Sequence, residues 1–184
     1  MAKLSVIIPV YNMSGHLRQC LLTIRETIRL PYEVIVVDDG SSDDECISIP
    51  NAGDDVYVLR SEVHRGFSHA VNMGIRASVG EVVLFLHADV LLAPFAVEDM
   101  LDSLIHDAAL GAVCAVASSV YERAQRLPDT PYEGWNGFVA TAAAIRAEKK
   151  APHAELLAEM IALMVRRDAV EAAGFLDERY TVPA

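Results

Sequence analysis

Runs of apolar, often β-branched residues recur through the first half of the chain, and each is followed by a polar turn. Residues 4–10 read LSVIIPV, a nearly continuous run that is typical of a strand covered on both faces in a parallel sheet. Similar runs predict strands at residues 33–37, 56–60 and 82–86. The pattern therefore indicates a sheet of buried, parallel strands.

Apolar residues at helical spacing fill the segments between these strands. One helix is predicted to begin at Ser14, which suits an N-cap, and to be stopped by Pro31. A second is predicted over residues 66–78, with Gly80 at its C-terminal cap, and a third begins at Pro94. Alternating strands and helices predict right-handed crossovers and a Rossmann-like, doubly wound, mostly parallel α/β sheet with helices on both faces.

The second part of the chain is less regular. Residues 110–120 predict a strand, whereas residues 123–137, with two prolines, two glycines and the only Trp, predict a surface excursion. A helix is predicted over residues 138–149. Residues 160–165 fit a strand or a helix, and the short helix that follows, closed by Gly174, favours the strand.

Composition narrows the class of protein. With 184 residues, 53% of them hydrophobic, the chain can bury one substantial core, which predicts a single α/β domain. A formal net charge of -11 argues against a surface that binds nucleic acid or anionic lipid. The three cysteines are odd in number and widely spaced, and no apolar run is long enough to span a bilayer. We therefore expect a cytoplasmic protein with reduced thiols, no nucleic-acid partner and no transmembrane segment.

Polar side chains recur where the predicted strands end. The groups are Pro9-Val10-Tyr11-Asn12, Asp38-Asp39, His64-Arg65-Gly66 and His87-Ala88-Asp89. Taken alone, each has an ordinary structural explanation, since Asn12 can cap a turn and an aspartate after a strand commonly forms an Asx-turn. Together they favour a ligand site, because open α/β sheets bind ligands outside the carboxyl ends of their strands.

The chain lacks the usual phosphate-binding motifs. No Gly-x-Gly-x-x-Gly follows the first strand, and no Gly-x-x-x-x-Gly-Lys-Ser/Thr is present. A carboxylate such as Asp89 repels a diphosphate unless a divalent cation stands between them. Because magnesium and manganese sites with phosphate ligands typically take only one or two protein carboxylates, Asp89 alone is sufficient in principle.

Four motifs in order resemble the family 2 glycosyltransferases of the GT-A fold. They are VIIPVYN, VIVVDDGSSDD, HRGFSHAVNMGIRASVGEVVLFLHAD and MVRRDAVEAAGFLDERY, and they span nearly the whole chain. The resemblance implies a single GT-A domain over residues 1–184, with residues 1–120 as the nucleotide-sugar-binding half and residues 121–184 as part of an acceptor-side region. It also implies a sugar transfer from a nucleoside-diphosphate sugar, with UDP-sugars favoured, to a hydroxyl of a carbohydrate or lipid-linked acceptor, with inversion.

The resemblance carries over to particular positions. Tyr11, flanked by Pro9 and Asn12, would line the base pocket, and Asp39 would accept a hydrogen bond from the base edge. Asp89 matches the last acidic residue of the family's Asp-x-Asp motif, and would hold Mg2+ or Mn2+ against the diphosphate as the catalytic carboxylate.

The remaining donor-side positions are implied less directly. Arg65 and Asn72 lie in the segment beside the nucleotide, and Ala88 lies inside the metal motif. His87 stands where many members have Asp or Asn. It would be either a metal ligand, which suits Mn2+ better than Mg2+, or a hydrogen-bonding neighbour of the metal site.

A second departure concerns the general base. The family's Glu-Asp pair, which usually supplies the base, is absent after Phe175-Leu176-Asp177-Glu178, and Asp177 and Glu178 themselves match a structural turn. We therefore expect a chain that is incomplete at its carboxyl end and transfers sugar poorly by itself. Two alternatives remain: a non-catalytic nucleotide-sugar-binding module of the same fold, and a sugar nucleotidyltransferase, which would normally show a Gly-rich, basic loop after the first strand.

Overall fold

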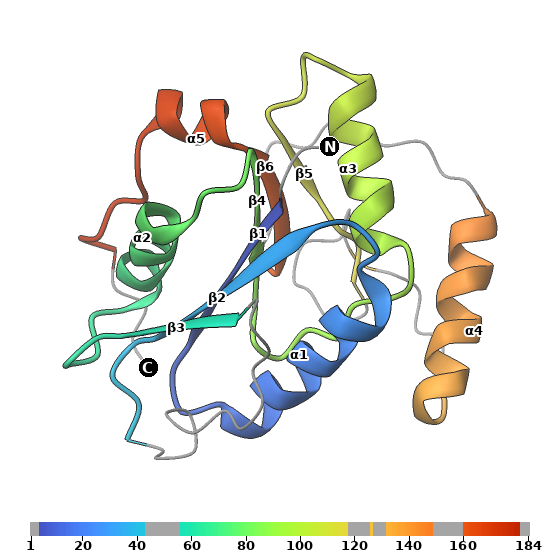
Figure 1. Ribbon diagram of the computed structural model, residues 1–184. Helices are drawn as coiled ribbons and strands as arrows, with labels where there is room; N and C mark the ends of the chain where they lie inside the picture. Colours follow the sequence, from blue (N-terminus) through green and yellow to red (C-terminus); the bar gives the residue numbers. More distant parts are fainter. Residues whose placement is uncertain (1–3, 43–55, 118–125, 127–131, 149–159, 181–184) are drawn as a thin grey trace.

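A six-stranded sheet organises the protein in the computed structural model, which describes residues 4–42, 56–117, 126, 132–148 and 160–180. The strand order is β3-β2-β1-β4-β6-β5 (Figure 1). The strands are β1 (Leu4–Val10), β2 (Tyr32–Asp38), β3 (Val56–Arg60), β4 (Val82–Leu86), β5 (Ala112–Cys114) and β6 (Ala162–Arg166). The first four strands run parallel, and β6 is antiparallel to both of its neighbours. The sheet is therefore mostly parallel, as the sequence predicts.

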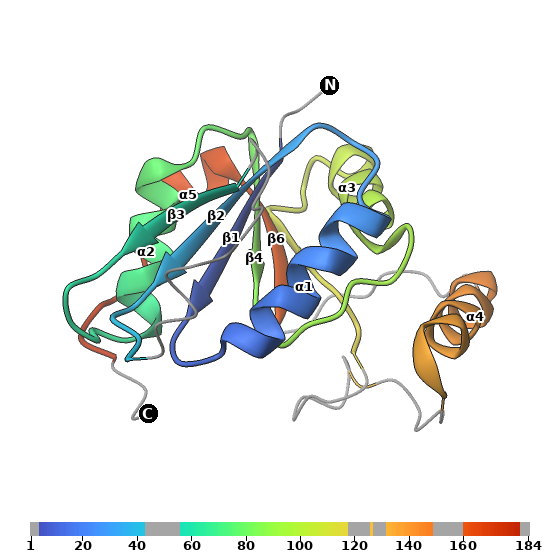
Figure 2. The same ribbon diagram turned by 60° about the horizontal axis from the view of Figure 1, so that its bottom comes forward.

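Helices cover both faces of this sheet. They are α1 (Ser14–Thr27), α2 (Phe67–Ala77), α3 (Ala96–His106), α4 (Gly134–Ala147) and α5 (Arg167–Ala173). Figures 1 and 2 show α1 and α3 on one face, α2 and α5 on the other, and α4 apart from the sheet. No helix in the described ranges is both long and apolar enough to cross a membrane.

The two faces of the sheet have separate apolar cores. Alternate residues of β1 point to opposite faces, so that Val6 and Ile8 pack with the cluster under α1 and α3, whereas Ile7 packs with the cluster under α2 and α5. Gly74 brings α2 close to β1, because a Cβ at this position would lie 2.3 Å from the Cγ2 of Ile7. Burial on both faces explains why the strands read as continuous apolar runs.

Several predicted boundaries are corrected by the backbone. Ser14 is the first residue of α1 rather than its N-cap, which is Met13. α3 begins at Ala96 rather than Pro94, because Phe95 adopts a left-handed conformation (φ 68°) that interrupts the helix there. Helix α2 is capped at Ser78, two residues before Gly80.

The later part of the chain also differs in places from the prediction. Within residues 110–120, the described strand covers only Ala112–Cys114, and residues 118–120 lie outside the described part. Helix α4 begins at Gly134, so that Trp135 lies in a helix rather than in the predicted excursion, most of which lies outside the described ranges. The ambiguous segment forms strand β6, and α5 ends at Gly174 (φ 87°) as expected.

Candidate donor site at the carboxyl edge of the sheet

The carboxyl edge of the sheet contains a topological switch point. From β1 the chain crosses through α1 to β2 on one side, and α2 later brings it back to β4 on the other side of β1. In open α/β sheets such a point opens a crevice for ligands. Tyr11 follows β1 and Asp89 follows β4. Since Ile7 pairs with Phe85 in parallel register, these two strand ends lie next to each other.

Asp39 organises the loop that joins β3 to α2. Its carboxylate is almost fully buried, with 4% of the side chain exposed. The backbone N–H of Gly66 donates to Oδ2 at 2.6 Å, and the N–H of Arg65 donates to both oxygens at 3.1 Å. The Nδ1 of His64 lies 2.9 Å from Oδ2. The carboxylate therefore fixes the start of α2, and Oδ1, with only the shared N–H of Arg65, retains acceptor capacity.

Gly40 allows this loop to lie directly against the end of β2. Its φ of +76° is in the left-handed region, and a Cβ would lie 2.6 Å from the backbone N of His64 and 2.6 Å from the carbonyl carbon of Val63. A side chain at this position would collide with backbone, which cannot swing aside as a side chain can. The turn after Asp39 is therefore built for close approach of the loop that carries His64.

An aromatic stack joins the first and third strand ends. The rings of Tyr11 and His64 lie 3.9 Å apart between centroids, with an interplanar angle of 24°. One face of the Tyr11 ring is thereby covered by the imidazole. His64 thus contacts both Tyr11 and Asp39.

Asn12 connects the turns that follow β1 and β2. It adopts a left-handed conformation (φ 52°). Its Oδ1 accepts hydrogen bonds from the N–H and the hydroxyl of Ser42, at 2.9 and 3.2 Å. Its backbone N–H donates to the Ser41 hydroxyl at 2.9 Å. These contacts hold the two turns together. The contact of Asn12 with a nucleotide stays a prediction.

The Asp89 carboxylate is exposed in a turn after β4. The N–H of Val90 donates to the His87 carbonyl at 3.2 Å and closes the turn, in which Ala88 is buried. Within the described part of the chain, the carboxylate of Asp89 makes no hydrogen bond or ion pair with another side chain. The imidazole of His87 lies 5.2 Å from the Phe67 ring, between centroids.

This donor set fits a cation that also takes ligands from a nucleotide. Among the described residues, no group of three or more His, Cys, Asp or Glu side chains could hold a metal by itself. Asp89 offers one unpaired carboxylate and His87 one imidazole, and magnesium or manganese held with substrate phosphates needs no more from the protein. Burial, followed by the charge of Asp89, raises the pKa of the Cys20 thiol to about 12.

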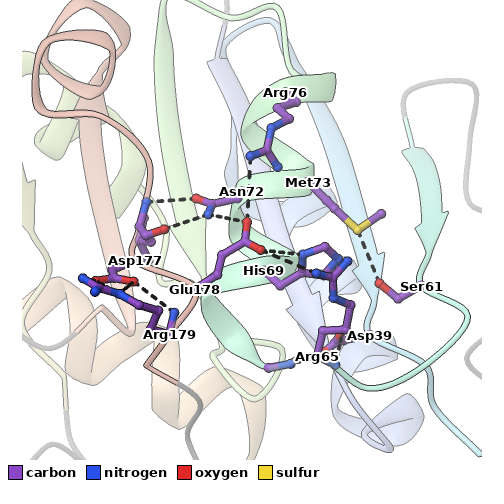
Figure 3. Close-up of polar contacts among 12 residues, drawn as sticks. Asp39, Ser61, Arg65, His69, Asn72, Met73, Arg76, Asp177, Glu178 and Arg179 are labelled. Carbon is purple, nitrogen blue, oxygen red and sulfur yellow. Dashed lines mark hydrogen bonds and ion pairs between the residues drawn. The ribbon is translucent and has the colours of Figure 1, made fainter.

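Asn72 connects α2 to the segment after α5. It is buried, its Nδ2 donates to the carbonyl of Leu176 and to Oε1 of Glu178, both at 2.9 Å, and its Oδ1 accepts the N–H of Leu176 at 3.0 Å. Figure 3 shows the amide between α2 and the segment after α5. The amide of Asn72 is thus hydrogen-bonded to this segment, and its place beside a nucleotide stays a prediction.

Glu178 lies at the centre of a polar cluster on α2 (Figure 3). Besides Asn72, its carboxylate contacts Nδ1 of His69 at 3.1 Å and lies 3.8 Å from Arg76 and 4.0 Å from Arg65. These four partners are spaced along one face of the helix and the residues before it. The hydrogen bond from Asn72, followed by that from His69, lowers the pKa of Glu178.

Neither acidic residue of this turn is arranged as a general base. Asp177 pairs with Arg179 at 2.6 Å, and hydrogen bonds from Arg179 lower the pKa of Asp177. A carboxylate with a lowered pKa is a weaker base, and Glu178 is held by α2 as well. The geometry therefore agrees with the sequence-based interpretation of Asp177 and Glu178 as parts of a structural turn.

Two described cavities lie away from this rim. One of about 340 Å³ and one of about 350 Å³ border α2 and α5, and Ile75, Val170 and Gly174 line both. None of the predicted donor-site residues lines either cavity. The identification of the rim as a candidate site therefore rests on topology and chemistry.

The mostly parallel sheet with helices on both faces is an α/β fold of the GT-A type. The family described as Glycosyl transferase family 2 matches residues 5–170. The chain belongs to this family.

Individual relatives agree with this assignment. The chain is 32% identical over 104 residues to the glycosyltransferase GlyG of Streptococcus pneumoniae, a match that covers 55% of this chain and 33% of the relative. Among solved structures, the mannosyltransferase PcManGT from Pyrobaculum calidifontis in complex with GDP-Man and Mn2+ superimposes with a TM-score of 0.68 at 25% identity, over 96% of this chain and 48% of that one.

A second solved structure shows the same fold. Residues 1-349 of S. aureus TarS in complex with UDP-GlcNAc superimpose with a TM-score of 0.66 at 21% identity, over 93% of this chain and 47% of that one. The matches to curated relatives span about a third of those relatives' length.

Proposed function

We propose that the rim binds the nucleoside-diphosphate sugar, with UDP-sugars favoured, for transfer of the sugar with inversion to a hydroxyl of a carbohydrate or lipid-linked acceptor. The observation that carries this proposal is the exposed carboxylate of Asp89 next to the switch point between β1 and β4, which pairs with no other side chain among the described residues. Its place at the edge of the sheet that also carries Tyr11 and Asp39 supports a role in ligand binding.

The base and the diphosphate would meet different parts of the rim. The uncovered face or edge of Tyr11 would contact the base, and Oδ1 of Asp39 would accept an N–H from the base edge. The guanidinium of Arg65, with 56% of the side chain exposed, is a cation available to the diphosphate, since its contact with Glu178 is long at 4.0 Å. Binding would hold the sugar above Asp89, where an acceptor hydroxyl could approach it.

A divalent cation would be held by Asp89 and His87. When bound, such an ion supplies charge neutralisation for the leaving diphosphate. The imidazole favours Mn2+ over Mg2+, and the Pyrobaculum neighbour was solved with Mn2+. Alternatively, His87 would be a hydrogen-bonding neighbour of the metal site rather than a ligand. Its contact with the Phe67 ring is compatible with this role.

The second candidate function is nucleotide-sugar binding without catalysis. It is favoured by the pairing of Asp177 with Arg179 and of Glu178 with α2, because neither carboxylate is free to take a proton from an acceptor. We therefore expect the 184-residue chain to bind donor and to transfer sugar poorly. Robust transfer by this chain would overturn that expectation.

On the spacing of the cysteines, we also propose a cytoplasmic location.

A nucleotide titration tests the donor site. UDP is titrated into the wild-type chain and into Asp89→Ala by calorimetry, with and without Mn2+, and the exposed Asp102 on α3 supplies the matched control Asp102→Ala. We expect Mn2+ to tighten binding about tenfold or more in the wild type and the control, and to have little effect in Asp89→Ala. Binding that is independent of metal and unchanged by Asp89→Ala would refute the assignment.

A further inference from the structure

We propose that Glu178, in the segment after α5, tunes the donor site by competing with the diphosphate of the nucleotide for the guanidinium of Arg65. The proposal rests on the proposed donor site, and it gives a second role to a carboxylate of a structural turn. The side chain of Arg65 is the link between the two. The proposed function places it at the diphosphate, and its Nη2 lies 4.0 Å from Oε2 of Glu178.

Arg65 is anchored by its backbone and only loosely held by its side chain. Its N–H donates to both oxygens of Asp39 at 3.1 Å, which fixes the main chain at the carboxyl edge of the sheet. More than half of the side chain is exposed. A separation of 4.0 Å is beyond hydrogen-bond distance, so the contact with Glu178 is an electrostatic attraction rather than a fixed pair. The guanidinium can therefore turn towards a stronger anion while its backbone stays in place.

The carboxylate of Glu178, in contrast, is held in place by α2 (Figure 3). Nδ2 of Asn72 donates to Oε1 at 2.9 Å, Nδ1 of His69 lies 3.1 Å from Oε2, and Arg76 lies 3.8 Å from Oε1. The hydrogen bonds from Asn72 and then His69 lower the pKa of Glu178, so the group carries its negative charge near neutral pH. A fixed anion thus lies beside a cation that is free to choose another partner.

A diphosphate that approaches Arg65 competes with this anion. Guanidinium groups bind phosphate oxygens through charge-assisted, often bidentate hydrogen bonds, which are stronger than an attraction across 4.0 Å. Binding of the donor would draw the guanidinium away from Glu178 and would bring the phosphate charge nearer to the Glu178 carboxylate. Both effects oppose binding. Removal of the charge of Glu178 should therefore tighten the binding of a nucleoside diphosphate.

The competition links the donor site to the segment after α5. Coupling between two sites is reciprocal, so a bound diphosphate also weakens the attraction of Glu178 to the loop that carries Arg65. Attachment of this segment to α2 and binding of the donor then oppose each other by the same factor. Glu178 is a positioning residue, which acts on the nucleotide through Arg65.

Three substitutions test this path. Glu178→Gln removes the charge and keeps an oxygen that can accept from Asn72, so the segment stays attached to α2. Arg65→Gln removes the contested cation, and a double variant that combines both changes shows whether one residue acts through the other. Asp177→Asn is the matched control, because it neutralises a carboxylate of the same turn that pairs with Arg179 at 2.6 Å.

The measurement is the affinity for UDP with Mn2+, by calorimetry. Each titration is made at an ionic strength of about 0.05 M, where charges are little screened, and again at about 1 M, where they are strongly screened. Thermal unfolding of each variant confirms that it is folded at the temperature of the titration.

The expected result is a gain in affinity from a substitution that lowers stability. At low ionic strength Glu178→Gln should bind UDP about two- to fourfold more tightly than the wild type, the size expected of an exposed charge contact, and the gain should vanish at about 1 M. Arg65→Gln should weaken UDP binding about tenfold, and the double variant should show no gain over it. Asp177→Asn should match the wild type. A residue that only supports the fold would weaken binding or leave it unchanged.

The outcomes distinguish this inference from the proposed function. A wild type that does not bind UDP contradicts the donor site itself. If the wild type binds UDP but folded Glu178→Gln binds it no more tightly at low ionic strength, the donor site stands and the competition is wrong. The competition is also wrong if Arg65→Gln binds UDP as the wild type does, if the gain persists in the double variant, or if Asp177→Asn shares it.

Discussion

Asp38, the last residue of β2, and Asp39, directly after it, hold different segments of the chain. Asp38 is fully buried, and its carboxylate accepts hydrogen bonds from the guanidinium of Arg60 at 3.0 Å and from the N–H of Ser41 at 2.9 Å. Asp39 instead accepts the backbone of the loop after β3. A pair of identical residues thus fixes two separate segments at the edge of the sheet.

Asp39→Asn should lower the free energy of unfolding by about 1 to 3 kcal/mol. An amide offers one acceptor oxygen and no charge, so even with that oxygen at the Oδ2 position its NH2 group faces the N–H of Arg65, and the hydrogen bonds from Arg65 and Gly66 are weakened. Urea unfolding measures the effect. The matched change Asp102→Asn, at an exposed position on α3, should alter stability by no more than about 0.5 kcal/mol. Equal stability of Asp39→Asn and the wild type would show that the loop does not depend on this carboxylate.

At the scale of elements, the segment after α5 is attached to α2 mainly through polar groups. Leu176 exchanges two hydrogen bonds with the Asn72 amide, and the carboxylate of Glu178 reaches His69 in the first turns of the helix. The opposite face of α2 carries Val71 and Ile75 into the apolar core. One helix therefore joins the sheet on one side and a distant segment on the other.

The contribution of Glu178 to stability should depend on pH. Its pKa is lowered in the folded protein, so its stabilising effect is present above the usual carboxyl value of 4.5 and is lost as the pH falls through the lower folded value. The wild type should therefore have a higher Tm than Glu178→Gln at pH 6, and the difference should shrink below about pH 4.5. Thermal unfolding by circular dichroism between pH 6 and pH 3 measures it.

Asp177→Asn is the matched control for this experiment. The pKa of Asp177 is also lowered, but its partner Arg179 belongs to the same exposed turn, and such a pair stabilises little. Its Tm should differ less from the wild type at pH 6 than that of Glu178→Gln. A Tm difference for Glu178→Gln that stays constant over the whole pH range would contradict an electrostatic role for this carboxylate.

At the scale of the whole molecule, the two edges of the sheet have separate tasks. The carboxyl edge holds the proposed donor site. At the amino edge, the buried carboxylate of Glu33 accepts hydrogen bonds from the hydroxyl of Ser5 at 2.6 Å and from the N–H of Val79 at 2.9 Å, and the same hydroxyl accepts the N–H of Gly80 at 2.8 Å. This network closes the connection between α2 and β4.

Glu33→Ala should therefore lower the stability of the protein and leave its affinity for UDP nearly unchanged. Loss of the carboxylate leaves buried donors without partners, and the free energy of unfolding should fall by about 2 to 4 kcal/mol. The affinity for UDP, measured with Mn2+ at a temperature where the variant is folded, should stay within about twofold of the wild type, because the site lies at the other edge. Glu81→Ala, an exposed carboxylate beside β4, is the control. A parallel loss of stability and UDP affinity would mean that the edges are coupled.

The sequence predicts the strands well because burial on both faces leaves a direct mark on composition. Residues 4–10 form β1 without a change of boundary, and the segment ambiguous between strand and helix forms β6. The direction of β6 could not be predicted, since an apolar run reads the same whether its partner is parallel or antiparallel. The N-cap at Ser14 and the helix start at Pro94 were misplaced because they depend on the backbone angles of single residues.

The candidate site was predicted by position but not by contacts. The strand ends placed Tyr11, Asp39 and Asp89 at one edge, whereas the hydrogen bonds of Asp39 to the β3–α2 loop have no local signal. Their partners lie 26 and 27 positions away, and Glu178 and His69 are 109 positions apart. Single-sequence patterns report faces and turns, and contacts of this range depend on the assembled fold.

The position of β6 between β4 and β5 has a consequence for how the chain folds. Strands β1 to β4, and with them the rim, belong to the first 89 residues, so this part can assemble while the rest is still being synthesised. Until residues 162–166 arrive, one edge of the fully apolar β4 has no hydrogen-bonding partner. Such an edge pairs readily with other chains, so nascent or slowly refolding protein passes through an aggregation-prone stage before its last strand docks.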